Sequence, residues 1–177
     1  MEAGLLLIRV VIGGIMTAHG AQKLFGWFGG HGLAGTRGWL DSMGFKPARL
    51  HASVVGLAEF AGGALLALGL LTPLGAAAVA GVMFVAIATV HWRNGFFNAQ
   101  GGYEFNLLIA ATAIALAITG PGEFSIDHLA GWTLAGPTWG LAALALSAAA
   151  AGSVLALRKP QPKQEQEETS RNEVPAT

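Results

Sequence analysis

The sequence predicts an all-α fold, a polytopic membrane helix bundle. Of its 177 residues 53% are hydrophobic and only 11% are charged, and the mean hydropathy is +0.55. Glu59 is the only Asp, Glu, Lys or Arg between Leu50 and Val90, a stretch interrupted only by Thr72-Pro73. Apolar runs of about 18–22 residues are long enough to cross a bilayer as helices.

Five membrane spans are expected along the chain. Proline is tolerated in a first helical turn, so Pro73 begins the third span, and Gly120-Pro121-Gly122 ends the fourth. Residues 158–177 are polar and charged, and we interpret them as a disordered cytoplasmic tail. The predicted spans are Gly4–Phe25, Leu50–Leu71, Pro73–His91, Glu104–Thr119 and Thr138–Leu157.

Loop charges predict the orientation of these spans. The loop of residues 120–137 carries Glu123 and Asp127 but neither Lys nor Arg, whereas the loops on the other side are basic. The positive-inside rule then places the N-terminus outside the cell and the C-terminus in the cytoplasm. The five tryptophans also fall near predicted interfaces, as in an aromatic belt.

The loop between the first two spans is long for a helix bundle. Residues Leu33–Met43 can form a short helix, with Gly44 ending it. This helix can lie on the inner leaflet, fold over a cavity mouth as a lid, or serve as a simple connector.

Polar residues of the first span gather on one face. Arg9, Gly13, Met16, Gly20 and Lys23 fall within about 40° of one line on a helical wheel. The glycines on this line allow a neighbouring helix to approach closely, so the face is expected to look into the bundle.

Glu59 is the centre of the expected site. A charge at the middle of a span costs about 2.5–3.5 kcal/mol, so it normally faces the protein interior and has a partner. The candidate partners are Arg9 from one side and His19 or Lys23 from the other. With His91 and Glu104 near the cytoplasmic interface, the pattern predicts a polar cavity that opens toward the inner leaflet.

Two other interpretations of these residues compete with a ligand site. A buried Arg–Glu pair can simply fix two helices in register. Metal or haem binding is disfavoured, because the sequence lacks cysteine, any Glu-x-x-His motif and any His-x-x-x-His motif. A formal net charge of zero disfavours nucleic acid as a partner.

Six segments, in this order and spacing, resemble the DoxX family of small bacterial membrane proteins over roughly residues 4–131. They are Arg9-Val10-Val11-Ile12-Gly13, His19-Gly20-Ala21-Gln22-Lys23-Leu24-Phe25-Gly26, Glu59-Phe60-Ala61-Gly62-Gly63, His91-Trp92-Arg93-Asn94-Gly95-Phe96-Phe97, Gly101-Gly102-Tyr103-Glu104-Phe105 and Gly120-Pro121-Gly122. The resemblance implies a four-helix bundle for residues 1–131. Residues 132–157 then add a fifth transmembrane helix that the family pattern does not explain.

The resemblance also implies a redox context, because the family is related to the DoxD-type subunit of thiosulfate:quinone oxidoreductase. The positions that match the family pattern are Arg9, His19, Lys23, Glu59, His91 and Glu104. A quinone-binding subunit is therefore expected, with no intrinsic cofactor and with electrons supplied by a cytoplasmic or membrane redox partner. Whether the chain is itself catalytic stays open, and a homo-oligomer is compatible with the pattern. There are two alternatives: a non-enzymatic scaffold that docks a cytoplasmic redox partner, and a small-molecule transporter.

Overall fold

The computed structural model describes residues 1–159, and this part of the chain contains helices and no strand. The predicted all-α fold is therefore confirmed. The main helices are α1 (Glu2–Phe25), α2 (Gly32–Ser42), α3 (Ala48–Leu68), α4 (Thr72–Ala86), α5 (Glu104–Thr119), α6 (Ile126–Leu129) and α7 (Pro137–Leu157). Single turns are η1 (Trp27–Gly29), η2 (Ile87–His91, a π-helical turn), η3 (Trp92–Asn94) and η4 (Asn98–Gln100).

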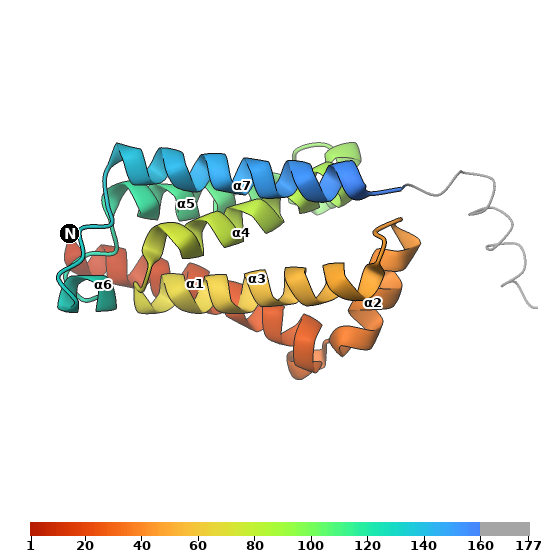
Figure 1. Ribbon diagram of the computed structural model, residues 1–177, viewed down its shortest axis with the longest axis horizontal. Coiled ribbons are helices and arrows are strands. Elements are labelled where there is room, and N and C mark those ends of the chain that lie inside the picture. The colour runs from red at the N-terminus through yellow and green to blue at the C-terminus, as the bar shows by residue number, and fades with distance from the viewer. Residues whose placement is uncertain (160–177) are drawn as a thin grey trace, which may run out of the picture.

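Four segments are long and apolar enough to cross a membrane: Glu2–Phe25, Ala48–Leu68, Thr72–Asn94 and Pro137–Leu157. The fourth predicted span, Glu104–Thr119, forms α5, which is apolar but has only 16 residues. At 1.5 Å per residue it is about 24 Å long, shorter than the roughly 30 Å hydrocarbon core. It nevertheless runs alongside α4 and α7 within the bundle (Figure 1).

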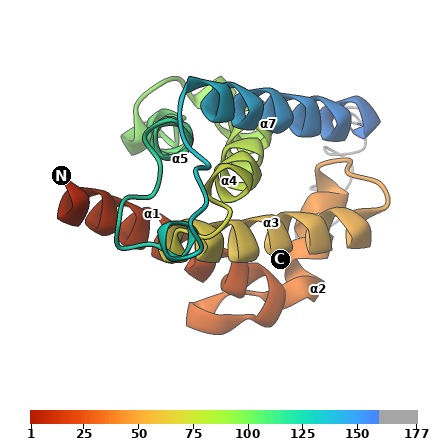
Figure 2. The same ribbon diagram turned by 60° about the vertical axis from the view of Figure 1, so that its left-hand side comes forward.

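The helices form two layers. Helices α1 and α3 pack against each other in one layer, with α2 joining them at one end. Helices α4, α5 and α7 form the other layer, and α4 also contacts α3 (Figures 1 and 2). Because α4 touches both layers, its small residues lie at the centre of the molecule.

The connections gather at two opposite ends of the bundle. At one end the Glu123 backbone N–H donates to Glu2 Oε2 at 2.8 Å, so the chain start lies beside the α5–α7 connection. At the other end Arg158 Nε donates to the Met43 carbonyl oxygen at 2.8 Å, and α2 lies there too (Figure 1). Successive long helices therefore run in alternating directions.

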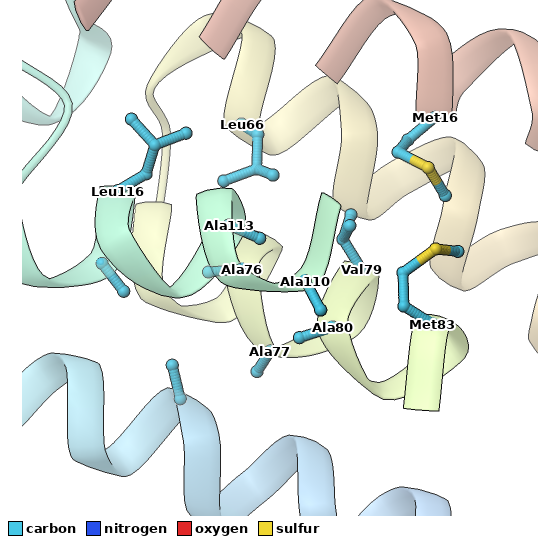
Figure 3. Close-up of a cluster of buried hydrophobic side chains, with 12 residues drawn as sticks. Met16, Leu66, Ala76, Ala77, Val79, Ala80, Met83, Ala110, Ala113 and Leu116 are labelled. Carbon is cyan, nitrogen blue, oxygen red and sulfur yellow. The ribbon is translucent and has the colours of Figure 1, made fainter. Parts of the chain in front are cut away.

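Two apolar clusters form the core. The larger one joins both layers and contains Met16, Leu66, Met83 and many alanines of α4 and α5 (Figure 3). The smaller one lies at the α2–α3 corner around Leu40 and Phe45. Alanine-rich faces let the helices approach closely, which is how helix packing gains energy in a membrane.

The predicted inward face of α1 is confirmed in part by burial, since Arg9, Gly13, Met16 and Gly20 are all buried. Lys23, the last residue of that line, is partly exposed. The close approach to α3 follows from glycine. A Cβ atom on Gly13 would lie 2.5 Å from the Gly63 carbonyl oxygen, closer than real Cβ contacts allow.

The short helix predicted at Leu33–Met43 is present as α2, one residue earlier at each end. Gly44 follows it with φ 85°, a left-handed conformation that favours glycine. Two buried residues, Thr36 and Leu40, pack α2 onto α1 and α3.

The first two residues of the predicted disordered tail make ordered contacts, which corrects the start of that segment. Arg158 and Lys159 belong to the folded part, because the Lys159 N–H donates to the Gly44 carbonyl oxygen at 2.9 Å. The Arg158 guanidinium also lies over the Phe45 ring, 5.5 Å from its centroid. These contacts hold the end of α7 against the α2–α3 corner. The prediction for the rest of the tail, residues 160–177, lies outside the described residues.

Candidate intramembrane polar site

Glu59 lies on the buried face of α3, between the two apolar clusters. It occupies the same helical stripe as Ala52 and Leu66, because residues seven apart lie almost directly above one another. Ala52 belongs to the smaller cluster and Leu66 to the larger one. Glu59 is only 4% exposed, so α3 carries its carboxylate into the bundle interior.

Lys23 of α1 is the partner of this carboxylate. Its Nζ atom lies 2.5 Å from Glu59 Oε2, and the exposed fractions of the two side chains are 23% for Lys23 and 5% for Glu59. The ammonium group therefore reaches from the helix end into the bundle and offsets part of the cost of burying the acid. Of the candidate partners named from the sequence, Lys23 is the one that makes the ion pair.

The chain after Lys23 fixes the end of α1. Gly26 ends the helix in a left-handed conformation at φ 76°, and Thr36 of α2 donates its hydroxyl to the Lys23 carbonyl oxygen at 3.1 Å. Gln22 Nε2 donates to the Phe28 carbonyl oxygen at 3.2 Å. Helix α2 thus holds the backbone that presents Lys23 to Glu59.

His19 lies one turn before Lys23 on α1, where residues four apart are neighbours on the helix surface. Its side chain is exposed, unlike that of Glu59. The imidazole is therefore beside the ion pair and outside the buried part of the site.

Arg9 belongs to a different part of the bundle. It is 1% exposed, and its Nη1 donates to the Ala67 carbonyl oxygen at 3.3 Å, near the far end of α3. Within the described residues Nε is buried without a hydrogen-bond partner. Arg9 Nη1 also lies beside Gly69, whose carbonyl oxygen accepts the Asp127 N–H, so Asp127 lies at the same end of α3. The expected Arg9–Glu59 partnership is absent from the described structure, because Ala67 lies two turns of α3 beyond Glu59.

Asp127 is a residue whose importance the sequence did not reveal. It is 1% exposed, and its carboxylate accepts hydrogen bonds from the Leu71 N–H at 2.7 Å and the Thr72 N–H at 3.0 Å. The Thr72 hydroxyl donates to it as well, at 2.7 Å. The acid thereby caps the N-terminus of α4 from the short helix α6, which is distant in the sequence. Its position two residues after Ser125, the N-cap of the short helix α6, was the only available signal.

His91 and Glu104 hold the loop between α4 and α5. His91 Nδ1 lies 2.7 Å from the Gly101 carbonyl oxygen, and Glu104 Oε1 accepts the Asn98 N–H at 2.7 Å. The Trp92 and Tyr103 rings stack at 5.4 Å across the same loop. Both side chains are thus engaged in loop structure, and the six predicted positions divide into three separate groups.

Aromatic rings cluster near the end of α1, close in sequence to Lys23 and Glu59. Phe60, next to Glu59, makes an edge contact with Phe25 at 5.5 Å between centroids, and Phe25 contacts Trp27 at 5.0 Å. Phe25 and Trp27 are more than half exposed. These rings therefore form an exposed apolar surface at the end of α1.

The chemistry available here is hydrogen bonding and proton exchange. A lysine ammonium can donate to a ligand carbonyl, and a carboxylate can accept or return a proton. No cluster of three or more His, Asp or Glu side chains suited to a metal ion occurs among residues 1–159.

Comparison with known proteins identifies the family. The DoxX family model matches residues 4–92. The "Putative oxidoreductase CatD" of Bacillus subtilis (strain 168) is 34% identical over 126 residues, which is 71% of this chain and 86% of the relative. The "Inner membrane protein YqjF" of Escherichia coli (strain K12) is 32% identical over 130 residues, or 72% of this chain and 92% of the relative.

No solved structure matches the chain. The family model nevertheless spans half of the sequence, and it includes α1, α3 and the Lys23–Glu59 pair. Both relatives are matched over most of their own length. The chain is a membrane protein and belongs to the DoxX family.

Proposed function

We propose that this protein is an integral membrane subunit of a quinone-linked redox system, with the ligand bound at the Lys23–Glu59 pair. The observation that carries the proposal is an ion pair whose acid is almost fully buried while its lysine remains 23% exposed. Such an arrangement offers a hydrogen-bond donor to an incoming carbonyl group and a proton acceptor behind it. The printed name of one relative, "Putative oxidoreductase CatD", also supports a redox role.

The surroundings suit a lipid-soluble ring. The exposed Phe25 and Trp27 rings and the partly buried Phe60 provide an apolar approach at the end of α1. His19, exposed one turn away, can exchange protons with water at the interface. The site has no cysteine, because the chain has none, so electrons come from a partner protein or from the substrate. The chain's part is to bind the quinone and to move its protons.

The orientation of the bundle decides from which leaflet the ligand enters. We infer that the end bearing α2, Lys23 and Arg158 is cytoplasmic, because the basic loop residues collect there. Reporter fusions after Thr177 and within residues 120–136 should then report cytoplasmic and external locations, respectively. Fusions that report the same side, or the reverse assignment, would contradict this orientation.

Removing the buried charge tests the site directly. Glu59→Gln keeps the shape of the side chain but cannot accept a proton, and it leaves Lys23 without a counter-charge. We expect the wild type in lipid nanodiscs to bind menadione saturably, and this variant to bind it at least about tenfold more weakly, since hydrogen bonds to charged groups contribute about 1.5–3 kcal/mol. Ultrafiltration with absorbance detection measures the affinity.

A second ion pair in the same chain provides the matched control. Lys46 Nζ and Asp41 Oδ1 also lie 2.5 Å apart, but both side chains are about half exposed. An exposed pair of this kind contributes little to stability. Asp41→Asn should leave menadione binding unchanged. A wild type that binds no menadione, or a Glu59→Gln variant with unchanged affinity, would overturn the proposed function.

A scaffold role is the second candidate, and a separate observation favours it. The loop between α4 and α5 is held rigidly by His91, Glu104 and the stacked Trp92 and Tyr103 rings. It nevertheless exposes Trp92, Phe96 and Phe97. A rigid loop that displays aromatic rings can dock a partner protein. In that case substitutions in this loop, rather than at Glu59, would release the partner.

A further inference from the structure

Two methionines meet in the middle of the bundle, next to the proposed site. Met16 of α1 and Met83 of α4 are 1% and 5% exposed, and their side chains point toward each other (Figure 3). Most of the neighbouring core residues are alanine, valine and leucine. Methionine is unbranched and flexible, so it fills gaps and can move aside for a ligand. This contact is therefore the most adaptable point of the larger cluster.

The methionine contact and the ion pair lie along the same stripes of α1 and α3. Met16 and Lys23 lie on one stripe of α1, seven residues or about 10 Å apart along the helix. Glu59 and Leu66 have the same spacing on α3, and Leu66 packs in the same cluster as Met16 and Met83. The polar pair thus lies about two helical turns from the thioether groups, toward the α2 end of the bundle.

An amide side chain also contacts Met83. Asn106 of α5 is half-buried, and its Nδ2 lies 3.6 Å from the Met83 sulfur. Within residues 1–159 this is the only side-chain hydrogen bond that Asn106 makes. A thioether is a weak acceptor, whereas an amide can donate two hydrogen bonds and accept others. In apolar surroundings such an amide normally bonds to a stronger partner on a neighbouring helix.

We propose that Met16, Met83 and Asn106 complete the binding site, an inference that rests on the proposed function. The two thioether side chains form a closed slot that separates to admit a planar ring. Lys23 donates to one carbonyl of the ring, and the Asn106 amide donates to the carbonyl at its opposite side. The four helices α1, α3, α4 and α5 then all contribute side chains to the site, two of them from α1. The ligand class is a two-carbonyl ring such as a benzoquinone or naphthoquinone.

The test pairs one substitution with two ligands. Menadione carries two carbonyl groups on opposite sides of its ring system, and a tetralone is a related bicycle with only one. Asn106→Leu should weaken menadione binding about three- to tenfold, the effect of one lost hydrogen bond. Tetralone binding should be the same in this variant as in the wild type. Both affinities are measured on the full chain in nanodiscs.

Control variants separate this inference from packing effects and from the proposed function. Thr112 lies on the same helix but bonds only within it, to the Leu108 carbonyl oxygen at 2.8 Å, so Thr112→Val should change neither affinity. Met83→Leu keeps the side-chain volume, but leucine is less flexible than methionine. This variant should therefore weaken the binding of both ligands, by a smaller factor than Asn106→Leu weakens menadione binding. Leucine is readily accepted in a membrane helix, so the Asn106 variant is expected to insert.

The outcomes are distinct. If menadione binds the wild type and Glu59→Gln weakens it, but Asn106→Leu does not, the assignment of Asn106 is wrong while the proposed function stands. Equal weakening of menadione and tetralone by Asn106→Leu also overturns the assignment, because it would show an effect on packing alone. If the wild type binds neither ligand, the proposed function fails and this inference fails with it.

Discussion

Replacing Asp127 by leucine is expected to lower the free energy of unfolding by about 3–5 kcal/mol. The carboxylate accepts both N–H groups at the start of α4 and the Thr72 hydroxyl, all in a buried place. Leucine would leave these donors without partners and would remove a negative charge from the end of the bundle where Arg9 is buried. It would also release the turn that holds Leu71 at φ 45°, a left-handed conformation that a non-glycine residue adopts only when its surroundings impose it.

The stability of purified variants in detergent, followed by thermal unfolding, measures this effect. Glu123 is an exposed acid of the same loop, so Glu123→Leu is the matched control and should change stability by less than about 0.5 kcal/mol. Arg9→Leu should also destabilise the protein, and the double substitution with Asp127→Leu should cost less than the sum of the two. Additive losses would show that the two charges do not act on each other.

Replacing Gly63 by alanine is expected to destabilise the α1–α3 contact by about 1–3 kcal/mol, with larger residues costing more. A Cβ atom at this position would lie 2.5 Å from the Thr17 backbone nitrogen and 2.6 Å from the Gly13 carbonyl oxygen. Both atoms belong to the backbone of α1, so relief requires the two helices to separate. Since Lys23 and Glu59 come from these same helices, the affinity of the proposed quinone site should fall together with stability.

A glycine pair within α1 makes this test specific. Gly13 faces α3, whereas a Cβ on Gly14 would meet nothing within 4 Å. Both lie in the middle of the same helix, so the gain in helix propensity from alanine is equal, roughly 1 kcal/mol. Gly13→Ala should therefore destabilise the protein, and Gly14→Ala should stabilise it slightly. Similar thermal midpoints for the two variants would refute the close-packing account.

The bundle was predictable because it depends on properties local to the chain. Long apolar runs specify membrane helices whatever their neighbours are, and the glycine line on α1 indicated which side of that helix is buried. Burial of Glu59 followed in the same way, because a carboxylate in a span has to avoid lipid. Gly44 as the end of α2 was predictable from the conformational freedom of glycine.

The partners of the charged residues were decided only by the tertiary structure. Arg9, His19 and Lys23 were all candidates for Glu59 in the sequence, because composition does not fix the tilt and offset of α1 against α3. The packing offset brings Lys23 to Glu59 and leaves Arg9 near Ala67, two turns further along α3. The offset between two helices is set by side-chain contacts between distant segments. Such contacts cannot be inferred from a single sequence.

The roles of Asp127 and Asn106 have the same origin. In the sequence Asp127 is a loop acid and Asn106 a single amide at the start of an apolar span. Only the folded chain places Asp127 at the start of α4 and Asn106 beside the Met83 sulfur. The sequence by itself determined the helices, their buried faces and the buried acid, since these follow from hydrophobicity and periodicity. The tertiary structure decided which polar groups meet, because hydrogen bonds and ion pairs act over a few ångströms between residues that are far apart in the chain.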